Sequence, residues 1–208
     1  MLTSKLLSAP IRAFLALFLP VSLVHAGLRD DLPASEYDAL IAFFQAAGGE
    51  SWENNTDWLD PDADDWFGVT TSSTESGRTV TEINLRLNGL TGFIPPEIGD
   101  LPSLIELILQ QNELGGSIPS EIGNLPQLVR LDLGTNRLSG SIPSEISNLS
   151  SLQSLGLTNN LLTGAIPPEL GDLPSLLSIA LSINSLSGTI PPELGNLASL
   201  TFLSLIHI

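Results

Sequence analysis

The sequence predicts an α/β solenoid, a stack of similar coils that each contribute one short strand and one short helical turn. Leucine and isoleucine recur with a period of 24 residues from Val80 onward. In each period the apolar residues alternate briefly, as in Leu107-x-Leu109, which is typical of a strand with its leucines pointing inward. One copy is too small to bury its own leucines, so the copies must stack.

Three further positions recur in register and explain how each coil turns. A buried asparagine is expected to bond backbone groups of its own and the next coil; it is found at Asn88, Asn112, Asn136, Asn160 and Asn184. A glycine that permits a turn follows at Gly92, Gly116, Gly140, Gly164 and Gly188. A proline expected to open a short helical turn stands at Pro95, Pro119, Pro143, Pro167 and Pro191.

The repeats occupy residues 80–208, with five complete copies and a sixth that is truncated. The sixth copy has Ile208 where the asparagine is due, and no polar C-terminal cap follows. We therefore expect the sequence to be a fragment of a longer chain. We also expect that the last three residues do not belong to the natural reading frame.

Residues 1–26 are typical of a secretory signal peptide. Lys5 and Arg12 give a positive start, and residues 13–24 are apolar apart from Pro20. Small residues at Val24 and Ala26 predict cleavage after Ala26. The alternative is an uncleaved anchor, which a run this short with a proline inside it disfavours. We expect a secreted or cell-surface protein.

Residues 27–79 precede the repeats and are expected to form an N-terminal cap that covers the first coil. Ser35-x-x-Asp38 has the spacing of a capping box, and the helix that follows should end at Gly48-Gly49. Its buried side would comprise Leu40, Ile41, Phe43 and Phe44. The three tryptophans, Trp52, Trp58 and Trp66, are expected to pack in the cap; the alternative is a ligand pocket that they line.

Two shorter predictions concern the end of the cap. Residues 66–70 should form a strand and residues 72–77 a turn. The alternating carboxylates of residues 60–65 suggest a calcium loop, but Asp65 and Thr71 stand where an EF-hand needs glycine and glutamate. An acidic solvated loop is therefore the favoured interpretation.

Composition excludes several classes of function. The chain has 23 acidic and 7 basic residues and a formal net charge of −16, which repels nucleic acids and anionic lipids. It has no cysteine, and after the signal segment its one histidine is His207. Cys–His and Ser–His nucleophiles and histidine metal sites are thus absent from the repeats. We expect neither an enzyme nor a cofactor.

The pattern Leu-x-x-Leu-x-Leu-x-x-Asn-x-Leu-x-Gly-x-Ile-Pro-x-x-Ile/Leu-Gly, over residues 80–205, resembles the plant-type leucine-rich repeat. Residues 35–71 also resemble that family's N-terminal cap, although Thr71 stands where plant caps usually have a cysteine. The resemblance implies a right-handed horseshoe that is secreted or displayed on a cell surface and binds other molecules. Relatives include receptor-kinase ectodomains and polygalacturonase inhibitors.

Specificity in such a horseshoe is expected on its concave face, where outward-facing positions vary from coil to coil. The first three coils carry polar and charged residues there, and the last two carry small neutral ones. The candidate ligand-binding residues are Glu82, Asn84, Arg86, Glu106, Ile108, Gln110, Arg130 and Asp132. The alternative is a solvated face without a ligand.

Two other rows recur in register along the coils. Glu97, Glu121, Glu145, Glu169 and Glu193 recur just after the helix-opening prolines. Stabilisation by the helix dipole is the favoured reason, and cation binding the alternative. A row of mostly Ser and Thr at positions 91, 115, 139, 163 and 187, flanked by positions 93, 117, 141, 165 and 189, has the spacing to meet ice, but Phe93, Gly115 and Ala165 interrupt it.

We therefore predict an extracellular recognition module for a protein, peptide or carbohydrate ligand, either secreted or the outer part of a truncated receptor. A membrane would be involved only through a C-terminal anchor beyond residue 208. The alternatives are a secreted inhibitor of a polysaccharide-degrading enzyme and a structural or ice-interacting repeat. Asn54 and Asn148 lie in glycosylation sequons.

Overall fold

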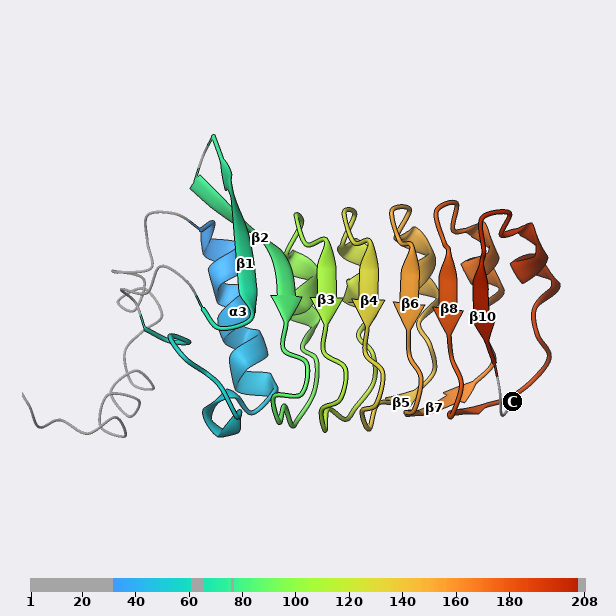
Figure 1. The fold of residues 1–208 in the computed structure, drawn as a ribbon, viewed down its shortest axis with the longest axis horizontal. Coiled ribbons are helices and arrows are strands. Elements are labelled where there is room, and N and C mark those ends of the chain that lie inside the picture. Colours follow the sequence, from blue (N-terminus) through green and yellow to red (C-terminus); the bar gives the residue numbers. More distant parts are fainter. Residues whose placement is uncertain (1–31, 61–65, 76, 206–208) are drawn as a thin grey trace, which may run out of the picture.

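The computed structural model describes residues 32–60, 66–75 and 77–205 and shows a stack of coils with a helical N-terminal end (Figure 1). The expected signal segment, most of the acidic loop and the last three residues lie outside the described residues. Within the described ranges, no helix is long and apolar enough to cross a membrane.

A seven-stranded sheet runs along the stack in the order β1-β2-β3-β4-β6-β8-β10 (Figure 1). Its strands are β1 (Val69–Thr74), β2 (Gly77–Asn84), β3 (Glu106–Ile108), β4 (Arg130–Asp132), β6 (Ser154–Gly156), β8 (Ser178–Ala180) and β10 (Phe202–Ser204). From β2 onward every pair is parallel, with Ile83, Leu107 and Leu131 in register and fully buried. The predicted parallel strands and inward leucines are confirmed.

The opposite side of each coil is built from short 3₁₀ helices, which lie behind the sheet in Figure 1. They are η2 (Pro96–Asp100), η3 (Ser120–Asn124), η4 (Ser144–Asn148), η5 (Pro168–Asp172) and η6 (Pro192–Asn196). Each begins directly after the recurring proline, whose carbonyl accepts the N–H three residues on, as Pro119 does from Ile122 at 3.2 Å. The proline-led helical turn is confirmed.

A second, three-stranded parallel sheet joins the coils along one flank (Figure 1). Its strands are β5 (Ser139–Gly140), β7 (Leu161–Gly164) and β9 (Ser185–Leu186). The recurring glycines lie on this flank with left-handed backbone angles, as expected for a turn that excludes a side chain, and φ is 77° at Gly140.

The recurring asparagines bond their own coil and the preceding coil, not the next one as predicted. The Asn136 amide donates to the carbonyls of Leu133 in its own coil and Leu109 in the preceding coil, both at 3.0 Å. Its oxygen accepts the N–H of Leu114, again in the preceding coil, at 3.0 Å. The Leu109 carbonyl also accepts from Asn112 in its own coil at 2.9 Å, so successive asparagines share one backbone acceptor and link neighbouring coils.

The cap consists of helix α3 (Ala34–Ala46) and the short helix η1 (Gly49–Ser51). The predicted capping box is wrong, because the residue that precedes the first helical turn is Pro33, two residues before Ser35. The Pro33 carbonyl accepts the N–H groups of Glu36 and Tyr37, and no side chain caps the helix. Proline suits the position before the helix, since its ring fixes φ near the observed −55°. The predicted end before Gly48-Gly49 is confirmed.

Aromatic rings fill the space between α3 and the first coil. Trp52, Trp58 and Trp66 are each only 6% exposed, and their centroids lie 5.1 Å (Trp52–Trp58) and 5.4 Å (Trp58–Trp66) apart. The Trp52 indole N–H donates to the Ala47 carbonyl at 2.7 Å. Burial with a satisfied N–H is what packing requires, so the tryptophans serve the core.

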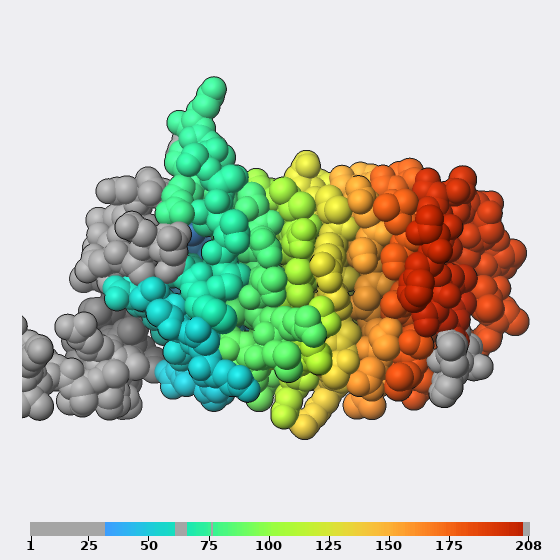
Figure 2. All heavy atoms as spheres, in the orientation of Figure 1, coloured from blue at the N-terminus to red at the C-terminus, as the bar shows by residue number. Residues whose placement is uncertain are grey.

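The end of the cap differs from the prediction. Residues 66–68 precede the strand, and β1 begins at Val69 and continues to Thr74, inside the segment expected to turn. It pairs antiparallel with β2, with Thr74 opposite Gly77. The β-branched run from Val69 favours the longer strand. The resulting hairpin projects beyond the stack (Figures 1 and 2).

Candidate functional site

The outward side chains of the seven-stranded sheet form rows across the coils, over the face shown in Figure 2. Because the register advances by one coil at a time, Glu82, Glu106 and Arg130 are neighbours in one row. Asn84, Ile108 and Asp132 are neighbours in the next. The structure thus brings the predicted residues of three coils together on one face.

Several of these side chains hold one another in place. The Arg130 guanidinium lies 3.3 Å from the Asp132 carboxylate, which also accepts the Gly134 N–H at 3.3 Å. A methyl group at Gly156 would come within 2.9 Å of Asp132 Oδ1, so the small residue of the next coil makes room for this carboxylate. The pair is therefore positioned by its surroundings, not by charge alone.

Two more contacts order the first coil. Arg86 Nε donates to Gln111 Oε1 at 2.7 Å, across to the second coil. Glu82 accepts from Asn84 at 3.3 Å and from Thr70 of strand β1 at 3.4 Å. By contrast, none of the hydrogen bonds or ion pairs between described residues uses the half-buried carboxylate of Glu106 or the side-chain amide of Gln110. The polar face is therefore ordered and still has bonding capacity.

Ile108 differs from the expectation that it projects into solvent. It lies in the outward row, but only 5% of its surface is exposed. The side chains of the neighbouring coils cover it, so Ile108 forms an apolar floor between Asn84 and Asp132.

The last two coils present a different surface. Their outward positions carry Ser154, Gly156, Ser178 and Ala180, which are half-buried and uncharged. Charge on the sheet face is therefore concentrated in the first three coils, as the sequence indicated.

Sequence reasoning missed a column of strained residues at the edge of this face. The residue before each recurring asparagine has a left-handed backbone with φ between 52° and 61°; these residues are Leu87, Gln111, Thr135, Asn159 and Ile183. Such angles are unfavourable for leucine and more so for β-branched isoleucine. Leu87 and Ile183 are also exposed. Asparagine at position 159 is the single residue in the column whose type signals this geometry.

The other predicted positions are placed as follows. Asn148 is exposed at the end of η4, whereas Asn54 is half-buried and its side chain accepts from Thr56 Oγ1 at 2.6 Å. The glutamate row lies in the first turns of the 3₁₀ helices. The hydroxyl row lies along the flank that carries the second sheet.

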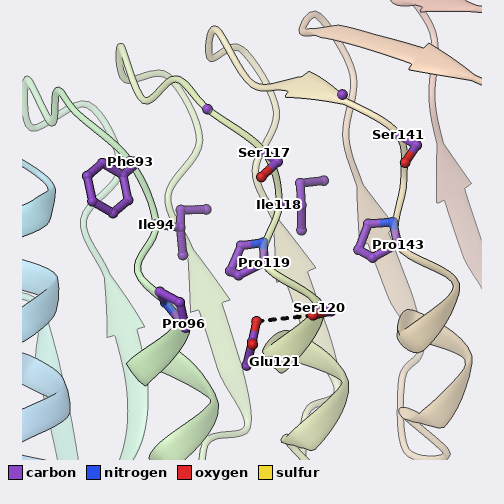
Figure 3. A pocket seen from close by; sticks show the side chains of 12 residues that line it. Phe93, Ile94, Pro96, Ser117, Ile118, Pro119, Ser120, Glu121, Ser141 and Pro143 are labelled. Carbon is purple, nitrogen blue, oxygen red and sulfur yellow. Dashed lines mark hydrogen bonds between the residues drawn. The ribbon is translucent and has the colours of Figure 1, made fainter.

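A groove of about 660 Å³ lies across the first three coils, between the second sheet and the 3₁₀ helices (Figure 3). Its walls include Phe93, Pro119 and Pro143, and among the described residues that line it Glu121 alone is ionisable. Ser120 Oγ donates to the Glu121 carboxylate at 3.2 Å. This groove is separate from the sheet face and was not predicted.

Comparisons with known proteins agree with the repeat geometry. The Leucine Rich Repeat family model matches residues 79–101, 103–125, 127–149, 151–173 and 175–197. The chain is similar to the ectodomain of the receptor kinase SOBIR1 from Arabidopsis thaliana, with 32% identity over 83% of this chain and 92% of that one, at a TM-score of 0.70. No curated protein sequence matches the chain.

Two further solved structures are similar over only part of their length. A plant ice-binding protein is 32% identical, with 85% of this chain and 57% of that one covered and a TM-score of 0.75. The plant peptide hormone receptor RGFR1, solved in complex with RGF2, is 39% identical, with 57% and 19% covered and a TM-score of 0.57. The chain thus spans less than two thirds of both proteins.

Proposed function

Because the chain belongs to the leucine-rich repeat family, we propose that it is an extracellular recognition module that binds a protein, peptide or carbohydrate ligand. The observation that carries the proposal is the ordered polar face of the first three coils, with Ile108 as its floor. Preorganised polar groups around an apolar floor favour binding, since little side-chain freedom is lost on association.

In this proposal residues 1–26 are a signal peptide cleaved after Ala26, residues 27–79 are the cap, and Asn148 and Asn54 are glycosylation acceptors. The protein is either secreted or part of a receptor ectodomain. The similarity to the peptide hormone receptor RGFR1, solved in complex with RGF2, supports a peptide or protein ligand above a carbohydrate.

The test begins with a phage library of linear peptides selected on the purified chain. Affinity of a selected peptide is then measured for a variant that combines Arg86→Ala and Arg130→Ala. We expect at least about a tenfold loss, since each guanidinium makes charge-assisted bonds. Arg137→Ala is the matched control, because Arg137 pairs with Glu113 away from the sheet face at 3.1 Å. Unchanged affinity in the double variant would contradict the proposed site.

A second candidate function is ice binding through the flank of the second sheet. The observation that favours it is the set of hydroxyls at Thr91, Ser139, Thr163 and Ser187 along the flank of the second sheet, where Thr163 also pairs with Ser185, together with the similarity to a plant ice-binding protein. Thermal hysteresis of the purified chain tests it. Thr163→Lys should abolish any hysteresis, and a freezing behaviour equal to that of an unrelated acidic protein rules the candidate out.

A further inference from the structure

The flank groove contains an aromatic side chain that breaks the repeat. Phe93 is 51% exposed, with its ring at one end of the groove (Figure 3). At the same position the following coils carry Ser117, Ser141, Ala165 and Thr189, all small. Phe93 is absent from the buried core, so packing gives no reason for this ring.

The charge of the groove is simple. Of the twelve described residues that line it, Glu121 is ionisable and none is basic. The Ser120 hydroxyl bonds one carboxylate oxygen, Oε2, and orients the group from within its own coil (Figure 3). In a chain with a net charge of −16, such a groove attracts a cation and repels an anion.

The walls are rigid and apolar. Pro96, Pro119 and Pro143 come from three successive coils, and the proline rings have little conformational freedom to lose when a ligand binds. Ile94 and Ile118 lie between them and are buried. Such walls suit the methylene stem of a long basic side chain better than a small hydrated ion.

We propose that this groove is a docking site for an arginine-bearing segment of a partner protein. The guanidinium pairs with Glu121, since its planar fork matches a carboxylate better than an ammonium does. The stem and the adjoining backbone cover Pro119 and its neighbours. A second basic side chain reaches the exposed face of Phe93, where the ring attracts a cation.

The groove is separate from the sheet face, because none of its lining residues is among the predicted ligand-binding residues. It therefore gives the molecule a second contact, on a flank that a ligand on the sheet face would leave open. A partner could bind both surfaces at once.

The experiment uses the full chain, labelled with ¹⁵N, at about 0.15 M ionic strength so that long-range attraction is screened. The probe is an acetylated and amidated pentapeptide with arginine at its second and fourth positions. We expect saturable shifts of the Ser117 and Ser141 amides. The same peptide with citrulline in place of arginine should not produce them.

The repeat supplies the variants. Glu121→Gln should weaken binding about tenfold, and Phe93→Ser, which installs the residue of the next coil, about threefold. Glu145→Gln is the matched control, since Glu145 holds the same position one coil later and does not line the groove. The Arg86→Ala and Arg130→Ala double variant should bind the probe normally, which separates this site from the sheet face.

Three outcomes would overturn the proposal. One is equal binding of the citrulline peptide. Another is an equal loss in Glu145→Gln and Glu121→Gln, which would mean diffuse attraction to an acidic protein. The third is full affinity for the arginine peptide in both the Phe93→Ser variant and the Glu121→Gln variant. Circular dichroism confirms folding of each variant, and the exposed position of Phe93 makes its replacement tolerable.

Discussion

The cap and the coils bury apolar side chains by different means. In the coils one asparagine geometry is used again and again, so the bonds of Asn136 recur 24 residues later at Asn160 with nearly the same lengths. In the cap each contact occurs once. Glu36, only 2% exposed, accepts from Thr79 Oγ1 at 2.8 Å and from the Val80 N–H at 2.7 Å, and so ties α3 to the strand of the first coil.

The difference shows where stability is specified. Damage to one coil removes only the contribution of that coil to the stability, because the other coils repeat the same interactions. The cap has no second copy of any contact, and the first coil depends on it. Damage to the cap should therefore cost more, and its effects should be seen first at the N-terminal end.

The largest effect is expected from Phe43→Ala. Phe43 is fully buried against Trp52, with ring centroids 6.0 Å apart, and its loss should lower the free energy of unfolding by about 3–5 kcal/mol. All three tryptophans lie in the cap, so their fluorescence reports on the cap alone, whereas far-ultraviolet circular dichroism reports on the whole chain. In urea, the fluorescence transition should come first.

Leu131→Ala in the third coil is the control, since Leu131 is equally buried. It should shift the dichroism transition without moving the fluorescence transition ahead of it. Coincident transitions in both variants would show that cap and coils unfold as one unit.

A matched pair of glycines gives an intermediate effect. Gly92 and Gly140 hold the same turn position, with φ of 73° and 77°. An added methyl group would meet the cap carbonyl of Ala46 at Gly92, but only the Ser117 side chain, at 3.6 Å, at Gly140. Gly140→Ala should cost about 1–2 kcal/mol from backbone strain, and Gly92→Ala about 1–3 kcal/mol more from the clash. Equal costs by urea unfolding would contradict the tighter fit at the cap.

The smallest effect is a dependence on alkaline pH. Burial, and then the negative charge of Asp38, raise the pKa of Tyr37 above its ordinary value of 10.0. The neutral ring is thus favoured in the folded cap. Its contribution to stability is fully present below the pKa of unfolded tyrosine, about 10, and is lost as the pH rises through the higher folded value.

Tyr37 is the one tyrosine in the sequence, so near-ultraviolet absorbance follows its ionisation directly. Ionisation should coincide with loosening of the cap, detected by tryptophan fluorescence. Tyr37→Phe should keep the fluorescence constant over the same pH range; a loss of equal size in this variant would assign the effect to another group.

The coils could be predicted because the same residue pattern recurs in each of them, so every copy supports the assignment of the others. Leu107 and Leu131 each confirm the other, and their burial follows from stacking alone. The cap offers no such redundancy. Pro33 and Ser35 are both ordinary signals of a helix start. The helix starts after Pro33 because the Pro33 carbonyl accepts backbone N–H groups of the first turn, and the sequence alone does not reveal these bonds.

The candidate site was predictable in position but not in detail. The rows of the sheet followed from the period, and so did the charge of the first three coils. The burial of Ile108 depends on the size of its neighbours in adjoining coils, and the flank groove depends on which coil carries Phe93. The left-handed angle of Ile183 runs against its own preference and is imposed by the repeat.

The backward direction of the asparagine bonds has a consequence for biosynthesis. Each asparagine satisfies groups of a coil that the ribosome has already made, as Asn88 does with Asn54 of the cap at 2.7 and 2.8 Å. A growing chain can therefore close its structure one coil at a time behind the site of synthesis. We expect the cap to serve as the template on which this vectorial assembly starts.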